Sequence, residues 1–274
     1  MIFFQLMNPF LVVNIILKNK YLLKQLVRRN IETRYKGSSL GLLWSFVQPL
    51  MMLCVYTFIF SLVLKARWGI ETDGGRGSFA IIMFCGMTIF NIFSESVVSS
   101  CSIILGNQSY VKKVVFPLEI LPIAQVLSTV ILSSVWFILL FAGTLILLNT
   151  ISWTMLLLPF TIIPLIMFTT GICFFMSSLG VYIRDVQHLI AVVMQILFFM
   201  TPIFYPLQAV PEKFRWILQL NPLALIVSET RKILLYGQQP DWILVGISFV
   251  VGAVVLQLGL VWFMKTKKGF ADVL

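Results

Sequence analysis

Apolar residues in this chain run in long blocks that polar turns separate. Six blocks approach the roughly 20 residues needed to cross a bilayer, and they cover residues 40–64, 79–105, 120–148, 154–182, 189–204 and 242–264. The fifth block is short, and Pro202 and Pro206 end it because proline cannot continue the helical hydrogen-bond ladder. Continuous apolar runs are typical of helices, whereas barrel strands alternate. The pattern predicts an all-α integral membrane protein with six transmembrane helices.

Composition leads to the same class. The chain has 274 residues, of which 59% are hydrophobic and 11% charged, and its mean hydropathy is +1.00. A soluble domain carries about 25% charged residues, so the bilayer must be the solvent here. We divide the chain into a cytoplasmic N-terminal segment (1–37), a six-helix transmembrane domain (38–264) and a cytoplasmic tail (265–274). Residues 1–17 are mostly apolar but are not typical of a signal peptide, because their positive charges follow the apolar stretch.

Lysines and arginines orient the bundle. Most lie at the two ends of the chain and in the second and fourth connections, which share one side of the membrane when the number of spans is even. The positive-inside rule therefore predicts a multi-pass protein of the cell (inner) membrane with both termini cytoplasmic. The net charge of +10 follows from this rule and from attraction to anionic lipid headgroups, so we expect no nucleic-acid partner.

Residues 21–36 form a basic amphipathic segment. Leu23, Val27, Ile31 and Tyr35 recur every four residues, and the opposite side carries a set of charges comprising Lys24, Arg28, Arg29, Glu32 and Lys36. This pattern predicts a helix lying in the membrane interface. Gly37 would end it, and Ser38 or Ser39 would cap the next helix.

Two cytoplasmic connections contain candidate partner contacts. The second, "GNQSYVKKVVFPLEILP", places basic residues among apolar ones: Tyr110, Val111, Lys112, Lys113, Val114, Val115 and Phe116. A docking knob for a partner explains this mixture, and a helix lying flat in the headgroups explains it as well. In the fourth connection, "YIRDVQH", Arg184 and Asp185 would form a local salt bridge or a second partner contact. The lone His188 is typical of a solvated side chain.

The connection between the last two blocks is long but apolar. It reads as two short helices broken at Asn221-Pro222, with Pro211 at the first position of one helix. Asn221 would cap the other helix, Pro222 would take its first position and Gly237 would end it. Neither helix is long enough to span a bilayer. We therefore expect a re-entrant helical hairpin at the outer face, because such segments are tolerated where they pack on protein.

Candidate chemistry is sparse. Of ten acidic residues, only Glu95 lies well inside a block, among serines. An intramembrane carboxylate marks a functional site by default, although a structural role capped by those serines is an equal alternative. No zinc-protease, nucleophile-elbow or phosphate-loop motif is present, and the four cysteines lack metal-ligand spacing. We expect no enzyme activity, bound cofactor or metal.

Aromatic residues recur along the first block. Trp44, Gln48, Met52, Tyr56 and Phe60 are spaced four apart and drift slowly around a helix. Such a stripe would line a path for a glycan, since sugars stack on aromatic faces. Contact with lipid at the membrane interface is the alternative.

Four stretches together resemble one family. They are "LVRRNIETRYKGSSLGLLWSFVQPL", "SIILGNQSYVKKVVFPLEILP", "YIRDVQHLIAVVMQILFFMTPIFYP" and "LNPLALIVSETRKILLYG". They are similar to the permease subunits of ABC-2-type polysaccharide exporters, which serve O-antigen, capsule and teichoic-acid export. The resemblance implies a homodimer with two copies of a cytosolic ATPase subunit, which uses ATP and magnesium. It also implies a substrate glycan linked to a polyprenyl diphosphate. Residues 1–17 and the Gly-rich loop at 73–77 are not part of this pattern.

The resemblance also assigns residue roles. The ATPases would pull on residues 111–116, and the diphosphate would meet Arg28, Arg29, Arg34 and Lys36, although positive-inside retention alone explains these charges too. Trp44, Tyr56, Phe60 and Glu95 would line the channel. Residues 211–236, including Pro211, Trp216, Asn221, Pro222 and Arg231, would gate or shape the outer mouth. The main alternative is an ABC-2 permease for a small drug or lipid. An ion-coupled transporter usually shows repeated halves, which are not found here.

Overall fold

The computed structural model describes residues 11–63, 78–112, 116–148, 152–206 and 209–274, and the regular structure in these ranges is helical throughout. The α-helices are α2 (Leu11–Lys18), α3 (Lys20–Arg34), α4 (Trp44–Tyr56), α5 (Ser78–Ser100), α6 (Gln108–Lys112), α7 (Ile120–Gly143), α8 (Pro159–Tyr182), α9 (Val186–Met200), α10 (Glu212–Gln219), α11 (Pro222–Leu234), α12 (Trp242–Thr266) and α13 (Phe270–Val273).

Within the described residues, five helical stretches are long and apolar enough to cross a membrane: Gly41–Phe60, Phe79–Ser100, Ile120–Ile146, Trp153–Tyr182 and Trp242–Val273. They confirm five of the six predicted spans. The remaining block corresponds to α9, which has 15 residues and is therefore about 22 Å long, less than the hydrocarbon thickness of about 30 Å. The backbone becomes extended at Thr201, directly before Pro202. A sixth span is thus not established by length.

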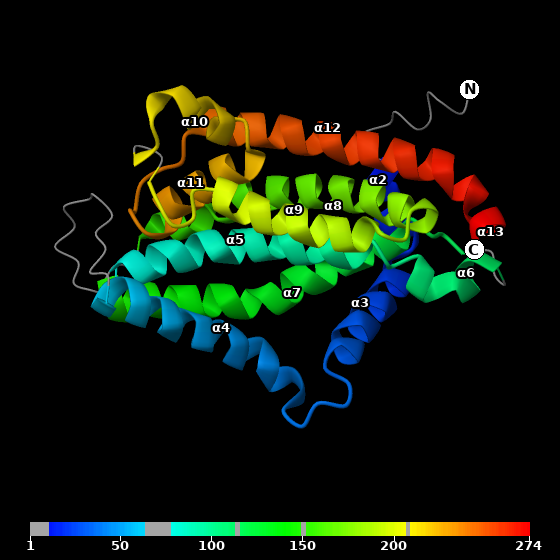
Figure 1. The fold of residues 1–274 in the computed structure, drawn as a ribbon, viewed down its shortest axis with the longest axis horizontal. Helices are drawn as coiled ribbons and strands as arrows, with labels where there is room; N and C mark the ends of the chain where they lie inside the picture. The colour runs from blue at the N-terminus through cyan, green and yellow to red at the C-terminus, as the bar shows by residue number, and fades with distance from the viewer. Residues whose placement is uncertain (1–10, 64–77, 113–115, 149–151, 207–208) are drawn as a thin grey trace.

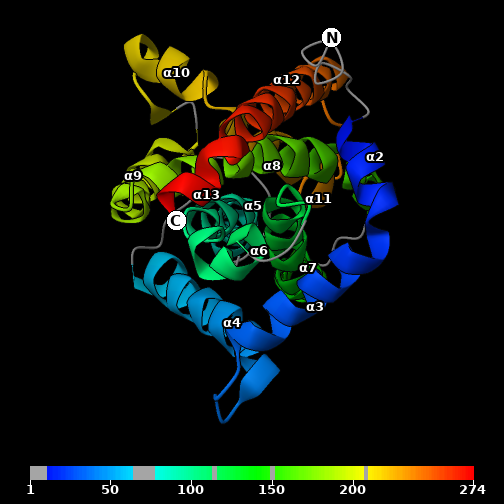
Figure 2. The same cartoon turned by 90° about the vertical axis from the view of Figure 1, so that its right-hand side faces the viewer.

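Helix α5 forms the centre of the bundle, with α4, α7, α8 and α9 around it (Figure 2). In its most apolar window 78% of the residues are buried, against 11% in the window that contains α4. The hydrophobic core accordingly follows α5, where Ile89, Ile92 and Val97 are fully buried. Helix α4 contacts the bundle along one side only and leaves most of its apolar surface exposed.

Helices α8 and α12 cross at an interface built from glycines. A Cβ atom added to Gly259 would lie 2.1 Å from the Gly171 carbonyl oxygen, and one added to Gly171 would lie 2.4 Å from the Val255 carbonyl oxygen. Both distances are below any real contact, so only residues without a side chain allow the two backbones to approach this closely. Small residues at crossings are the usual means of packing helices in membranes, where van der Waals contact drives association.

The amphipathic segment folds as α3. Its apolar stripe packs against the start of α7, where Leu23, Leu26 and Val27 join a buried cluster that includes Leu121 and Ala124. Helix α3 ends at Arg34, two residues earlier than predicted, and Gly37 adopts a left-handed φ of 86° in the corner that follows. The location of α3 at a membrane interface stays a prediction.

The predicted cap after this corner is wrong. The next helical turn starts at Gly41, after Leu40, and no side chain caps it. Ser38 and Ser39 lie within the corner itself, and the Ser38 amide bonds back to the Tyr35 carbonyl. The chain therefore makes the corner through glycines with positive φ (86° at Gly37 and 51° at Gly41), which carry no Cβ penalty in that conformation.

Helices α10 and α11 lie at the end of the bundle opposite α3, α6 and α13 (Figure 1). They confirm the predicted pair of short helices. Pro222 occupies the first turn of α11, and Gly237 follows the helix with a φ of 61°. Pro211 is the N-cap of α10 instead of its first residue. Whether this hairpin re-enters the membrane stays a prediction.

Candidate functional site

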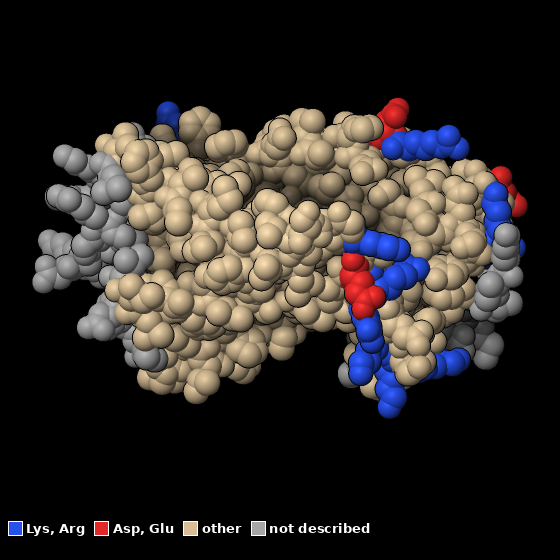
Figure 3. All heavy atoms as spheres, turned by 90° about the horizontal axis from the view of Figure 1, so that it is seen from below, with Lys and Arg blue, Asp and Glu red and all other residues tan. Residues whose placement is uncertain are grey.

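Charged side chains gather at one end of the face seen in Figure 3, and a broad expanse without charged side chains lies beside them. Among the described residues, three ion pairs lie at this end: Arg28–Glu32 at 2.6 Å, Arg34–Glu95, and Lys267–Glu119 at 3.0 Å. A surface free of charge suits contact with lipid, where an isolated charge is costly. The candidate site therefore lies at the border between the charged end and the apolar expanse.

A polar cleft opens at this border between α3, α5 and α7. Its volume is about 430 Å³, and Asn30 and Thr33 from α3, Ser99 from α5, and Gln125 and Ser128 from α7 line it. A smaller cavity of about 70 Å³ adjoins it toward α4. The two cavities share Arg34, Glu95 and Leu132.

Arg34 and Glu95 meet in this cleft. The Arg34 guanidinium Nη1 donates to the Glu95 Oε1, and both side chains are about one-third exposed, 35% for Arg34 and 31% for Glu95. The Thr129 hydroxyl also approaches Oε1, at 3.5 Å. The structure therefore pairs Arg34, which was predicted to contact the diphosphate, with Glu95, which was predicted to line the channel. The alternative in which serines cap Glu95 is not what the structure shows.

The sequence interpretation missed Asn30, Thr33, Gln125 and Ser128. A signal existed in α7, because Gln125 and Ser128 are three apart in an apolar block and share a helix face. In α3 no such signal exists. Asn30 and Thr33 are polar residues on an amphipathic helix, so the sequence predicts that they face solvent.

The other basic residues of the N-terminal segment have separate surroundings. Arg28 is exposed beside Glu32, whose carboxylate raises the pKa of the Arg28 guanidinium. The hydrogen bond between them is the larger cause, and charge attraction is the smaller one. Lys36 is exposed in the corner after α3. Arg29 instead points to α6: it donates to the Asn107 Oδ1 and to the Tyr110 hydroxyl, both at 3.0 Å.

The predicted docking knob contains α6. Tyr110 stacks on Phe116 with the ring centroids 4.4 Å apart, and both rings pack against the buried cluster beneath α3 together with Val111. The Lys112 ammonium donates to the backbone carbonyl oxygen of Leu274 at the end of the chain. Lys113, Val114 and Val115 lie outside the described residues.

The second predicted contact lies in the connection between α8 and α9, at the same end of the bundle as α6 (Figure 1). Arg184 and Asp185 are both exposed. In the described part of the chain they form no ion pair with each other, so a local salt bridge does not account for them.

The predicted aromatic stripe begins on α4 and continues into the helical stretch Thr57–Val63, and its two ends have different surroundings. The Tyr56 ring lies 6.4 Å from Phe204, and the Phe60 ring lies 5.4 Å from Phe79 and 6.1 Å from Phe204. These rings form an aromatic cluster that links α4 to α5 and to the segment after α9. Trp44 is 40% exposed at the start of α4. The stripe is thus not one continuous lining surface within a single chain.

Several hydrogen bonds tie the hairpin of α10 and α11 to the rest of the bundle. The Asn221 Oδ1 caps α11 by accepting from the Leu223 amide at 3.0 Å, and its Nδ2 donates to the Thr201 hydroxyl at 3.0 Å. Arg231 is 6% exposed and donates to the carbonyl oxygens of Ile82 (3.2 Å), Pro202 (2.7 Å) and Ile203 (2.9 Å), which belong to α5 and to the turn after α9. Trp216 is 59% exposed on α10.

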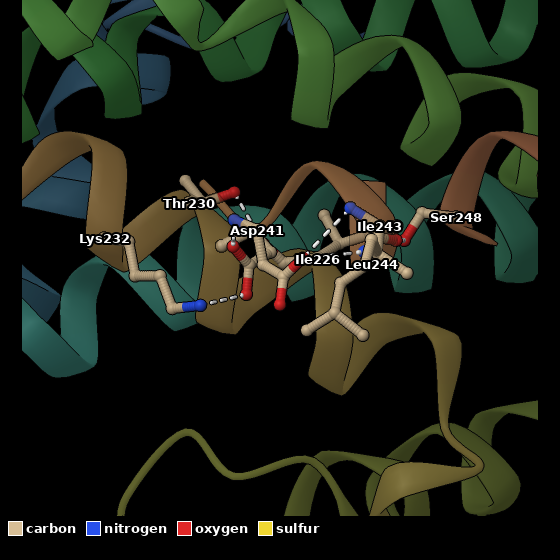
Figure 4. A network of polar contacts seen from close by, with 8 residues as sticks. Ile226, Thr230, Lys232, Asp241, Ile243, Leu244 and Ser248 are labelled. Carbon is tan, nitrogen blue, oxygen red and sulfur yellow. Dashed lines mark hydrogen bonds and ion pairs between the residues drawn. The ribbon is translucent and has the colours of Figure 1, made fainter. Parts of the chain in front are cut away.

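A second polar network closes the hairpin against α12 (Figure 4). The buried Glu229 accepts from the Lys232 ammonium at 2.8 Å and from the Asp241 amide at 2.7 Å. Asp241 in turn caps α12 by accepting from the Ile243 amide at 2.9 Å. These contacts fix α11 relative to α12, so α11 is an anchored element, whereas the exposed α10 is less constrained.

The sequence is similar to a known protein family and to several characterised proteins. A family model described as ABC-2 type transporter matches residues 21–235. The O-antigen export system permease protein RfbA of Klebsiella pneumoniae is 28% identical over 255 residues, which are 92% of this chain and 95% of that protein. A protein of the same name from Myxococcus xanthus is 27% identical over 227 residues, 80% of this chain and 82% of its own. The polysialic acid transport protein KpsM of Escherichia coli is 24% identical over 251 residues, 88% of this chain and 92% of its own.

Proposed function

The chain belongs to the ABC-2 type transporter family, and we propose that it is the membrane-spanning subunit of an ATP-driven exporter of a lipid-linked polysaccharide. It would move the glycan from the cytoplasmic to the outer side of the cell membrane. The observation that carries this proposal is the similarity, over nearly the whole chain, to permeases named for O-antigen and polysialic acid transport. The polar lining of the cleft supports it over export of a small drug, because drug-sized apolar ligands fit predominantly hydrophobic pockets.

The energy would come from partner subunits. We propose that two copies of a cytosolic ATPase bind and hydrolyse ATP with magnesium and dock on α6 and on the α8–α9 connection. The two surfaces lie at the same end of the bundle (Figure 1). Lys112, Arg184 and Asp185 are exposed there, as a docking surface requires.

A second copy of the chain would complete the transport path. Helices α4 and α9 lie on the same side of the bundle (Figure 2), and their exposed apolar residues include Met51, Val55, Val192, Ile196 and Phe199. We propose that a homodimer covers these faces and that α9, although short, serves as the sixth span. Trp44 and Tyr56 on α4, and Phe60 in the helical stretch Thr57–Val63 that follows it, would then face a path between the two copies.

Orientation completes the proposal. Both termini would be cytoplasmic in the inner membrane, because α3, α6 and α13 carry the charged end of the bundle (Figure 3). The hairpin of α10 and α11 would shape the outer mouth, with Trp216 at its exposed surface. Arg28, Arg34 and Lys36 would meet the diphosphate of the lipid carrier, since guanidinium suits bidentate contact with phosphate.

Depleting the chain in its native cell tests the function. Surface polysaccharide should fall to near background while the lipid-linked glycan accumulates inside, because synthesis continues without an exit. Extraction of the lipid-linked pool and immunostaining of intact cells measure the two quantities. Re-expression of the wild-type chain should restore both, and surface polysaccharide that persists after depletion would contradict the proposal.

Arg29 is expected to couple the ATPase to α3, because its guanidinium joins α3 to α6 through Asn107 and Tyr110. In Arg29→Gln both hydrogen bonds are lost. Export and transport-dependent ATPase activity should fall several-fold, and the amount of chain in the membrane should not change. Surface polysaccharide and ATP turnover of the reconstituted complex are the measurements.

Lys24→Gln is the matched control for Arg29. It removes one positive charge from the exposed side of the same helix, and exposed charges contribute little to stability. It should behave as the wild type does. If both variants lost export and ATPase activity equally, the positive charge of α3 would be responsible for coupling, and the hydrogen bonds of Arg29 to Asn107 and Tyr110 would not.

A further inference from the structure

The polar cleft between α3, α5 and α7 has the size of a ligand site. Its volume of about 430 Å³ lies within the range of roughly 300–1,000 Å³ that small-molecule sites occupy. It opens beside the charged end of the bundle, where a ligand from the cytoplasmic leaflet would enter. Nothing in the docking of an ATPase or in the outer hairpin requires such a cleft.

The lining of the cleft suits a polyhydroxylated group. Apart from Arg34 and Glu95 its polar side chains are neutral, and they include the amides of Asn30 and Gln125. Among the described residues, these two amide groups make no hydrogen bond to other side chains or to the backbone. Each amide offers two donors and an acceptor. Sugar hydroxyls both donate and accept, so they match such a lining better than a bare ion does.

The Arg34–Glu95 pair marks where an anion would bind. The Glu95 carboxylate occupies one of the donor positions of the guanidinium fork, with Thr129 as a further contact at 3.5 Å. A phosphate carries more charge than a carboxylate and can accept from guanidinium in the same bidentate geometry. Because both side chains are about one-third exposed, an incoming phosphate can reach Arg34 without unfolding its surroundings.

An aromatic surface adjoins the same point. The smaller cavity, which also contains Arg34 and Glu95, is lined by Tyr35 and Trp136. The Trp136 ring stacks on Phe84 with the centroids 5.3 Å apart, which holds its orientation. Aromatic faces next to neutral hydrogen-bonding groups are suited to a sugar ring.

We propose that this cleft binds a sugar phosphate, the phosphate replacing Glu95 at Arg34 and the sugar contacting Asn30, Thr33 and Gln125. Glu95 holds Arg34 at the position where the phosphate would bind. The inference rests on the proposed function and specifies its substrate: the cleft takes the first sugar and the adjacent phosphate of the lipid-linked glycan. A phospholipid with a hydroxylated headgroup shares this chemistry, and the experiment separates the two sources.

Binding to the purified full-length chain in detergent tests the site by calorimetry with three probes. They are a short-chain polyprenyl diphosphate carrying one N-acetylglucosamine, the same diphosphate without sugar, and phosphatidylglycerol. Glu95→Gln should tighten binding of both diphosphates about tenfold, because the competing charge is removed, and Arg34→Gln should weaken it about tenfold. Thermal unfolding of each variant checks that its fold is kept.

Gln125→Leu tests the sugar contact separately. It should weaken binding of the sugar-bearing probe several-fold and leave the sugar-free probe unchanged. The control is Gln195→Leu, which replaces an exposed amide on α9, outside the cleft. The sugar contact is supported when Gln125→Leu binds the sugar-bearing probe more weakly than this control does and the two variants bind the sugar-free probe equally.

Several results would overturn the proposal. Unchanged or weaker diphosphate binding in Glu95→Gln would show that the ion pair is structural only. Equal affinity for the probes with and without sugar would remove the sugar subsite, and preference for phosphatidylglycerol would assign the cleft to phospholipid. Each of these results leaves the proposed export function standing, because that function depends on the depletion experiment. Surface polysaccharide that persists after the chain is depleted would instead refute the function.

Discussion

Replacing Gly259 with leucine should prevent the chain from accumulating as a folded protein in the membrane. The new Cβ atom would lie 2.1 Å from the Gly171 carbonyl oxygen, so α8 and α12 would have to separate along their whole crossing. Extra methylene groups in a well-packed core cost roughly 1–3 kcal/mol. The cost here should exceed that range because the obstacle is backbone, which cannot rotate away. Membrane abundance and monodispersity on size exclusion in detergent measure the effect.

Gly246→Leu on the same helix is the matched control. A Cβ atom at Gly246 meets nothing within 4 Å, and the residue is exposed. It should therefore accumulate at nearly the wild-type level and elute as the wild type does. If Gly246→Leu were as damaging as Gly259→Leu, helix propensity or hydrophobicity would be responsible and not the close crossing.

Arg231→Met should detach the hairpin of α10 and α11 from the bundle. The variant fills a similar volume but loses the hydrogen bonds to the carbonyl oxygens of Ile82, Pro202 and Ile203. Hydrogen bonds to charged groups contribute roughly 1.5–3 kcal/mol each when buried, so we expect a loss of at least about 3 kcal/mol. The unfolding temperature of the purified chain should fall, and protease sensitivity of α10 and α11 should rise. Export should also be lost, since we propose that this hairpin shapes the outer mouth.

Two further variants make this result specific. Arg231→Lys keeps the charge but not the planar fork, so its unfolding temperature should lie between the wild type and Arg231→Met. Lys213→Met removes an exposed charge from α10 and should have little effect. A wild-type unfolding temperature for Arg231→Met would refute the anchoring role of this residue.

The position of Arg231 also shows why its predicted role changes. The family resemblance implies that residues 211–236, Arg231 among them, gate or shape the outer mouth. The structure buries its side chain, and Gly86 leaves the space that its guanidinium fills, since an added Cβ would lie 2.8 Å from it. Any gating therefore falls to exposed parts of the hairpin such as Trp216, and Arg231 holds the hairpin in place.

Local features of the chain were predictable. The apolar blocks that became α5, α7, α8 and α12 follow from the requirement that backbone polar groups be satisfied within each helix in lipid. The cap at Asn221 and the break at Pro222 follow from the chemistry of single residues. The stripe of α3 was predictable from its spacing, because residues four apart share a helix face.

Contacts between distant segments were not predictable. Arg34 and Glu95 are 61 residues apart, and Arg29 and Tyr110 are 81 apart. Arg28 and Arg29 are neighbours with the same chemistry in the sequence, yet one faces solvent beside Glu32 and the other joins α3 to α6. Which arginine binds which partner depends on the angle between helices, and no pattern along a single helix encodes that angle.

The sequence by itself determined that this is a helical membrane protein with its positive charge at one end, because hydropathy, helix signals and charge are properties of short segments. Only the tertiary structure decided that Glu95 faces Arg34 in a polar cleft and that the glycines of α8 and α12 meet. The physical reason is that each long helix presents several possible faces to its neighbours. Packing of all the helices together selects one face, and that choice places the few polar side chains beside one another.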